Sequence, residues 1–158
     1  MQIIIMTRDR YLEYGLMRML NGYRLTTGRE LFDAGKRRLP LPEDSYVILC
    51  DRNLERLTYC MFCGRRFLVI PVSSVRCLTD IRQAIRRGAW LFGHTARSLT
   101  RTEMVVVFGV IFHEYGCTFL ADQLGISMKT VCAHLYNAME KSGLRGVSVK
   151  YLCSTADR

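Results

Sequence analysis

Residues 127–141 carry the side chains with the clearest potential for binding chemistry. Val131, Leu135 and Ala138 recur there at helical spacing, which predicts a helix whose apolar side packs against the rest of the protein. Its other side holds hydroxyl, amide, aromatic and lysine groups but few charges. A turn at Gly125 joins this helix to a preceding apolar segment, so the two form a helix-turn-helix pattern. The second helix of such a pattern is a candidate for insertion into the major groove of DNA.

Cys60 and Cys63 are the other chemical candidates, because their C-x-x-C spacing suits zinc or a redox-active pair of thiols. A structural zinc site needs four ligands, and no second C-x-x-C or histidine pair accompanies them. The seven cysteines are odd in number and irregularly spaced, which disfavours the disulfide framework of a secreted protein. No histidine–acid pair or phosphate-binding loop indicates catalysis. The sequence thus predicts reduced thiols, no metal, no cofactor and no enzyme, with a thiol redox enzyme as the last-ranked alternative.

The elements that position the helix-turn-helix are all predicted to be helical. Thr100 and Glu103 form a capping box, in which the threonine oxygen accepts a backbone N–H and the glutamate reaches back. Ser127 caps a later helix in the same manner. The predicted helices are 100–114, 117–124, 127–141 and 147–153.

Residues 1–92 have a different organisation, in which β-branched apolar runs alternate with helical patterns. This order predicts a small parallel α/β layer. The polar, glycine-led stretch 93–98 is predicted to link this layer to a second domain at 99–158. The predicted fold is therefore an α/β layer followed by an all-α domain. The predicted strands are 3–6, 46–50 and 67–72, and the predicted helices are 11–20 and 78–88.

Three motifs follow one another in the C-terminal part: Leu99-Thr100-x-x-Glu103, then Leu120-Ala121-x-x-Leu124-Gly125-Ile126-Ser127-x-Lys129-Thr130-Val131-x-x-His134, and finally Asn137 and Lys141-x-Gly143. This series resembles the LuxR/FixJ (GerE-type) DNA-binding domain over residues 99 to about 153. The resemblance implies a four-helix domain and a bacterial transcriptional regulator. The chain departs from the family by one extra residue between Glu103 and Ala121, which we expect the loop 113–116 to absorb. It also has Ser142 where the family places leucine, which we expect to weaken the packing.

The resemblance also assigns roles to individual residues. Those implied near DNA phosphates are Ser127, Lys129 and Thr130, with Asn137 and Lys141 as further backbone contacts and His134 as a wedge or backbone contact. Those implied at base edges are Cys132, Ala133 and Tyr136. In this family the last helix often forms the dimer contact, for which the candidates are Val147, Val149, Tyr151 and Leu152. The alternative for these four residues is that they close the core of their own domain.

The N-terminal part resembles the receiver domain of response regulators, shortened by one or two strand–helix units. Asp51 follows the strand predicted at 46–50, where a receiver carries its phosphorylated aspartate. Thr7 and Arg8 stand where a receiver places the acidic pair that holds Mg²⁺. We therefore predict that Asp51 is not efficiently phosphorylated and that Arg8 pairs with it. A degenerate receiver joined to a GerE-type domain resembles the RcsA- and GadE-like auxiliary regulators of enteric bacteria, several of which act with a partner of the same family.

The charge distribution bears on the partner. Lysine and arginine outnumber acidic residues 23 to 14, for a formal charge of +9, which favours a polyanion such as double-stranded DNA. Residues 99–158 hold 6 basic and 5 acidic side chains, so most of the excess lies in residues 1–98. A nearly neutral helix-turn-helix is expected to bind DNA weakly alone. Dimerisation, DNA contacts from the arginine-rich N-terminal part, or a helix-turn-helix devoted to protein contacts would each account for this.

The sequence thus favours two functions of different kinds. The first is a cytoplasmic, nucleoid-associated regulator that binds promoter DNA independently of phosphorylation, as a homodimer or as a heterodimer with a LuxR/NarL-type response regulator. The second is an adaptor or anti-activator that pairs with such a regulator without reading DNA. No membrane partner is expected, because the longest apolar stretch, 104–112, has nine residues and a membrane span needs about 20.

Overall fold

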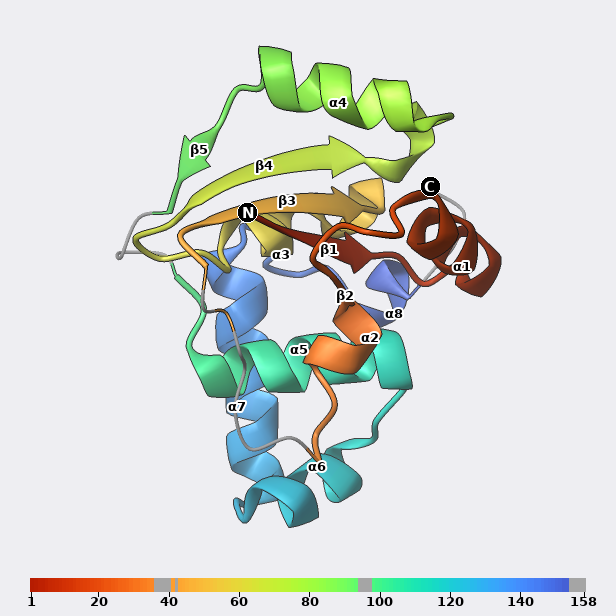
Figure 1. The fold of residues 1–158 in the computed structure, drawn as a ribbon. Helices are drawn as coiled ribbons and strands as arrows, with labels where there is room; N and C mark the ends of the chain where they lie inside the picture. Colours follow the sequence, from red (N-terminus) through yellow and green to blue (C-terminus); the bar gives the residue numbers. More distant parts are fainter. Residues whose placement is uncertain (36–40, 42, 94–97, 154–158) are drawn as a thin grey trace.

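The apolar runs predicted as buried strands form the centre of a five-stranded sheet (Figure 1). The computed structural model describes residues 1–35, 41, 43–93 and 98–153, apart from the side chains of 150 and 151. The strand order is β2-β1-β3-β4-β5, in which β1 to β4 are parallel and β5 runs antiparallel to β4. The strands are β1 (Gln2–Met6), β2 (Leu25–Thr27), β3 (Ser45–Cys50), β4 (Arg66–Pro71) and β5 (Leu91–Phe92).

The three predicted strands are confirmed as β1, β3 and β4. β1 and β3 pair from Gln2 with Tyr46 to Met6 with Cys50. Because helices cover the sheet on both faces, these central strands are apolar at nearly every position, as expected for a buried parallel sheet. The layer is not purely parallel, since the short edge strand β5 turns back against β4.

Helices cover the two faces of the sheet unequally (Figure 1). One face packs against α1 and α4, whose buried residues include Leu16 and Ile81. The opposite face packs against two short helices, α2 and α3, and against the long helix α5. The helices predicted at 11–20 and 78–88 are confirmed, whereas α2 and α3 are additional. Their bounds are α1 (Arg10–Met19), α2 (Gly28–Leu31), α3 (Glu55–Tyr59), α4 (Leu78–Arg87) and α5 (Arg101–His113).

The four helices predicted in the C-terminal part are confirmed. The Glu103 N–H donates to Thr100 Oγ1 at 3.2 Å, and the Thr100 N–H donates to Glu103 Oε1 at 2.8 Å, so the capping box is also confirmed. α5 ends at Glu114, which takes a left-handed conformation at φ +55°. After α5 come α6 (Cys117–Leu124), α7 (Met128–Lys141) and α8 (Val149–Leu152).

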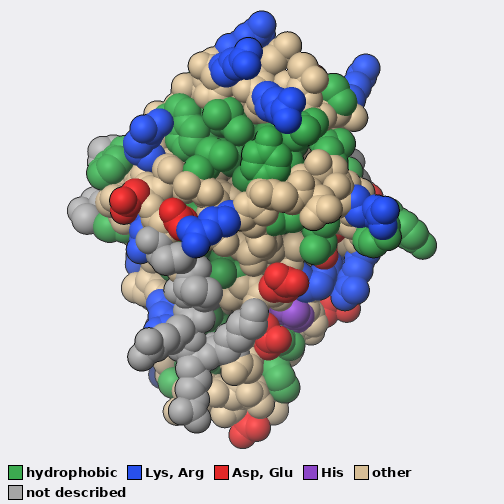
Figure 2. All heavy atoms as spheres, in the orientation of Figure 1, with side chains coloured by type: hydrophobic (Ala, Val, Ile, Leu, Met, Phe, Trp, Pro, Cys, Tyr) green, Lys and Arg blue, Asp and Glu red, His purple; other side chains and the backbone are tan. Residues whose placement is uncertain are grey.

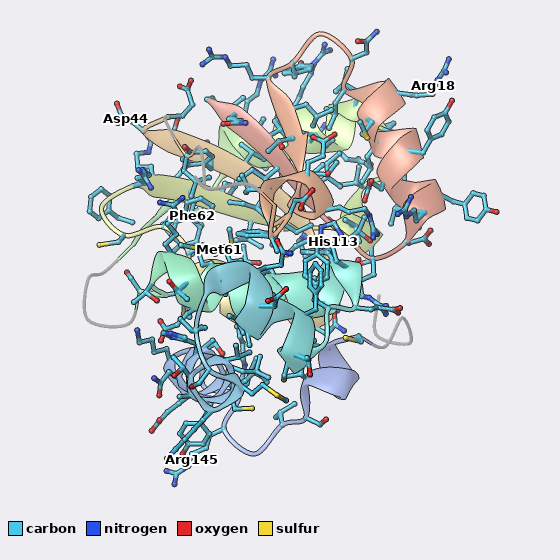
Figure 3. All side chains as sticks on the ribbon, turned by 90° about the horizontal axis from the view of Figure 1, so that it is seen from below. Arg18, Asp44, Met61, Phe62, His113 and Arg145 are labelled. Atoms are coloured by element: carbon cyan, nitrogen blue, oxygen red, sulfur yellow. The ribbon has the colours of Figure 1, made fainter. Side chains whose placement is uncertain are left out.

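α5 connects the two parts of the chain through a shared core. Its Phe108 ring stacks on Phe32 with ring centroids 4.5 Å apart, and Met61 and Phe62 lie in the same core between sheet and helices (Figure 3). A helix that is buried on most sides is apolar all round, which accounts for the apolar run in α5. Most of the predicted linker, 94–97, lies outside the described residues. The division into two domains stays a prediction, and the two parts pack as one body.

Candidate nucleic-acid interface

α6 and α7 form the helix-turn-helix, with a turn that requires a left-handed residue. Gly125 ends α6 at φ +66°, a conformation that glycine adopts without steric cost. The Ile126 N–H then donates to Ala121 O at 3.0 Å and closes the end of α6. Ser127 Oγ accepts from the Thr130 N–H at 3.1 Å and caps α7, as predicted. These contacts fix the direction in which α7 leaves α6.

Apolar packing fixes one side of α7. Val131 and Ala138 are fully buried, and Leu135 is half-buried beside them. Val131 packs with Leu120 of α6 and Val106 of α5 in a small core below the sheet. Burial of one such side chain contributes about 1.5–3 kcal/mol, so the rotation of α7 about its axis is well determined. The predicted inner side of the helix is confirmed.

The other side of α7 is open to solvent. Tyr136 is 53% exposed, and no described residue forms an ion pair with Lys129. His134 is half-buried at the margin. The exposed side, which we call the α7 stripe, consists of Ser127, Lys129, Thr130, Cys132, Ala133, Tyr136 and Asn137.

Lys141 has a different role from the one predicted. Its Nζ donates to Glu103 Oε1 at 2.7 Å and to Ser98 O at 3.2 Å. The Glu103 side chain is 4% exposed. Its burial acts to raise the pKa, but hydrogen bonds from Lys141 and Thr100 outweigh this and lower the pKa of Glu103. The lysine ties α7 to the start of α5, and its ammonium group is therefore occupied within the protein.

Ser142, which stands where the family places leucine, has its hydroxyl fully hydrogen-bonded, and the expected weakening of the packing stays a prediction. Its side chain is buried, and its Oγ donates to Ala138 O at 2.9 Å and Met139 O at 3.1 Å. A buried hydroxyl with partners carries no penalty for an unsatisfied polar group. The serine therefore fits this position by bonding the backbone of its own helix.

The four candidate dimer residues lie in different environments. Leu152 is fully buried in the core shared with the sheet, so it is not free to contact a partner. Val147 and Val149 are half-buried and line a groove of about 410 Å³ whose other wall includes Tyr136. The side chain of Tyr151 lies outside the described part of the chain. Val147 and Val149 therefore remain candidates for a dimer contact, and Tyr151 stays an untested prediction.

Thr7, Arg8 and Asp51 meet at the carboxyl ends of β1 and β3. Thr7 Oγ1 donates to Asp51 Oδ1 at 2.7 Å, and the Arg8 backbone N–H donates to Asp51 Oδ2 at 3.1 Å. The Arg8 guanidinium turns away, since Nε donates to Ile111 O at 3.0 Å and Nη2 to Glu114 Oε1 at 3.2 Å. The predicted side-chain pair between Arg8 and Asp51 is therefore wrong. The negative end of the α5 dipole attracts the cation instead.

We expect acetyl phosphate and Mg²⁺ to leave Asp51 unlabelled. Asp51 is 3% exposed, and both of its oxygens already accept hydrogen bonds. Its burial raises the pKa against the opposing effect of those bonds, so this carboxyl is a poor phosphoryl acceptor. Intact-mass measurement after incubation checks this, with a complete receiver domain labelled in parallel as the control. A stoichiometric phosphoryl adduct on Asp51 would contradict the expectation.

The thiols form no disulfide, although Cys117 and Cys132 lie close enough to share a hydrogen bond between α6 and α7. All seven cysteines are free, with Cys60 half-buried and Cys63 exposed. Within the described ranges, no group of three or more His, Cys, Asp or Glu side chains is arranged to hold a metal ion. No helix of the described chain is both long enough and apolar enough to cross a bilayer.

The arginine-rich helix α4 lies at the end of the molecule opposite α6 (Figure 1). Its exposed basic residues include Arg82, Arg86 and Arg87. Basic side chains gather at this end, above an area of apolar side chains (Figure 2). The basic residues of α4 therefore do not extend the α7 stripe.

One polar cluster was not anticipated from the sequence. Arg8, Arg10 and Arg29 line a cavity at the C-terminal end of α5, together with His113 and Glu114. Each arginine stands just after the end of β1 or β2, but β2 has three residues and gives no periodic signal. The pairing of distant segments at this edge of the sheet is what brings the arginines together.

Comparison with known proteins gives no relative of this chain: no family model, no curated protein and no solved structure matches it. The function is therefore inferred from the residues and their geometry.

Proposed function

We propose that this protein is a bacterial transcriptional regulator that binds promoter DNA through the α7 stripe, in a LuxR-type helix-turn-helix. The observation that carries the proposal is the exposure of this stripe on a helix whose opposite side is fixed by α5 and α6. A helix presented in this way fits the major groove. Ser127, Lys129 and Thr130 lie at its N-terminal end, where backbone N–H groups and the helix dipole favour phosphate. Cys132 and Tyr136 follow at positions suited to base edges.

A dimer accounts for the low charge of the stripe. Lys129 is its single charged residue, so one copy neutralises few phosphates. Two linked modules bind more tightly than either alone. The groove at Val147 and Val149 offers a surface for a second copy or for a LuxR/NarL-type response regulator. Such a regulator works without phosphorylation, because Asp51 is buried and already hydrogen-bonded.

One observation favours a second candidate function, that of an adaptor or anti-activator. Cys132 and Tyr136 belong to the α7 stripe and also line the groove beside Val147. A partner regulator that filled the groove as far as Cys132 and Tyr136 would cover part of the stripe and exclude DNA, whereas a dimer contact confined to Val147 and Val149 would leave the stripe open. The two functions therefore make opposite predictions for DNA binding in the presence of a partner.

Chromatin precipitation with the tagged full-length chain, followed by sequencing, tests the proposal. We expect enrichment of promoter fragments. A gel shift of a recovered fragment with the purified chain, alone and with a co-purified regulator, then separates homodimer from heterodimer. A chain that purifies with a regulator but retains no DNA in either assay would establish the adaptor function instead.

A further inference from the structure

A cavity of about 380 Å³ opens beside the C-terminal end of α5. Arginines reach it from three segments, since Arg8 follows β1, Arg10 begins α1 and Arg29 lies on α2. The cavity thus lies at the carboxyl edge of the sheet, where α/β proteins bind ligands. No residue of the α7 stripe lines it.

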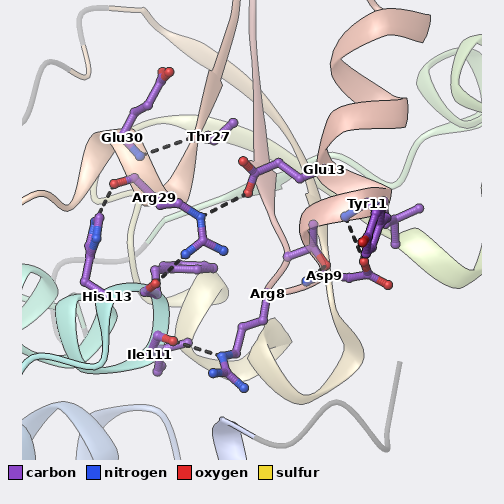
Figure 4. A network of polar contacts seen from close by, with 12 residues as sticks. Arg8, Asp9, Tyr11, Glu13, Thr27, Arg29, Glu30, Ile111 and His113 are labelled. Carbon is purple, nitrogen blue, oxygen red and sulfur yellow. Dashed lines mark hydrogen bonds and ion pairs between the residues drawn. The ribbon is translucent and has the colours of Figure 1, made fainter.

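The last turn of α5 holds two of the guanidinium groups in place (Figure 4). Arg8 Nε donates to Ile111 O at 3.0 Å, and Arg29 Nη1 donates to Phe112 O at 2.6 Å. Arg29 Nε also lies 3.5 Å from Glu13 Oε2. A guanidinium has five N–H donors, so each group keeps donors that no described residue accepts. The two arginines are therefore pre-positioned and incompletely satisfied.

Arg10 adds a further positive charge at the mouth of the cavity. Its side chain is exposed and has no ion-pair partner among the described residues. Two carboxylates accompany the three arginines: Glu13 pairs with Arg29, and Glu114 pairs with Arg8. The Glu114 side chain is 77% exposed, so an entering anion can displace it at little cost. Arg8 and Arg29 could cap the end of α5 without any cavity beside them. Capping alone therefore explains neither the open cavity nor the presence of Arg10 at its mouth.

We propose that this cavity binds a small phosphate-bearing anion. Guanidinium forks pair with phosphate oxygens through two parallel hydrogen bonds, which is the chemistry that Arg8 and Arg29 offer here. The volume lies near the lower end of the range for small-molecule sites. His113 supports the site, because its Nε2 lies 2.6 Å from Arg29 O and holds α2 against α5. This anion site is separate from the proposed DNA contact, because no residue of the α7 stripe lines it and anion binding does not require DNA.

Isothermal titration calorimetry on the full chain tests this, in phosphate-free buffer with inorganic phosphate and pyrophosphate as separate probes. We expect saturable binding of at least one probe with one site per chain. Arg10→Gln should weaken that binding about tenfold or more, the loss expected for one charge-assisted contact. Its melting temperature should be unchanged, because Arg10 has no structural partner. Arg18→Gln, on the same helix but outside the cavity, is the matched control and should bind as the wild type does.

The absence of saturable binding for both probes would overturn the proposal, as would equal affinity in the Arg10→Gln variant. A short DNA duplex forms the third arm. If Arg10→Gln weakened duplex binding while neither free anion bound, the arginines would belong to a DNA contact, and the small-anion site would be excluded while the proposed function stood. If the chain bound a free anion but retained no DNA, the anion site would stand and the proposed function would fail.

Discussion

Replacing Lys129 and Tyr136 together by alanine is expected to lower the affinity for a promoter fragment about 100-fold, since loss of a DNA contact costs on the order of 1–3 kcal/mol. Both side chains lie on the α7 stripe, with Tyr136 about two turns after Lys129. Loss of the lysine alone should reduce the dependence of log affinity on log salt by about one unit, because one phosphate contact disappears. Fluorescence anisotropy at several salt concentrations measures both effects.

The stripe variant should keep the wild-type melting temperature, because neither residue is buried. A matched control replaces another basic residue and another tyrosine, Arg82 on α4 and Tyr11 on α1, both exposed and distant from α7. This control should bind the promoter as the wild type does. Wild-type promoter affinity in the stripe variant would show that DNA does not contact this side of α7.

Lys141→Met should act on folding and not on DNA contacts. It removes the cation that pairs with the buried Glu103 carboxylate, which costs about 1–3 kcal/mol, because the lysine is 31% exposed and the carboxylate keeps its bond from the Thr100 N–H. The lowered pKa of Glu103 means that the pair stabilises the fold above the unfolded-state pKa and that this stability is lost as pH falls through the folded-state value. Urea unfolding between pH 7 and pH 3 checks this: the variant should lose stability mainly at neutral pH and differ least in acid. Equal stability of the two proteins at pH 7 would contradict the assignment.

Local signals were sufficient for the long elements of this fold. The apolar run of β1, the capping box at Thr100 and Glu103, and the Ser127 cap each depend on neighbours within four residues, so the sequence displays them directly. The same holds for the inner side of α7, where Val131 and Ala138 follow helical spacing. By contrast, β2, β5, α2 and α3 are short and carry neither a long apolar run nor a helical pattern of their own, so they depend on packing against the longer elements.

The destinations of the long polar side chains could not be predicted. The Arg8 guanidinium bonds to Ile111 O and Glu114, about a hundred residues away, only because α5 lies on the sheet. Lys141 likewise finds Glu103 because α7 crosses the start of α5. The family resemblance implied a DNA contact for Lys141, and the neighbouring strand ends suggested Asp51 as the partner of Arg8, but tertiary packing supplies partners that the local pattern does not contain.

Phe108→Ala is expected to destabilise the whole chain by about 3–5 kcal/mol, the usual cost of deleting a buried phenyl ring. Phe108 is fully buried on α5, where its ring stacks on Phe32 beside the sheet and lies 6.1 Å from the Phe112 ring, centroid to centroid. Deleting this ring would leave an empty space between α5 and the sheet, which is where the two parts of the chain meet. A loss of this size lowers the melting temperature by roughly 6–20 °C for a protein of this length.

The variant also decides whether the predicted boundary at 93–98 separates two folding units. Trp90, the single tryptophan, packs against the far face of the sheet, so its fluorescence reports on the N-terminal part, whereas far-UV circular dichroism reports on the helices of both parts and so includes the C-terminal ones. Because one core contains residues of both parts, we expect the two signals to shift together in urea. Phe92→Ala, which removes an exposed ring from β5, is the matched control and should leave both transitions in place. A fluorescence transition that stayed at its wild-type midpoint while the helical signal moved would show that the parts fold independently and that α5 only rests on the sheet.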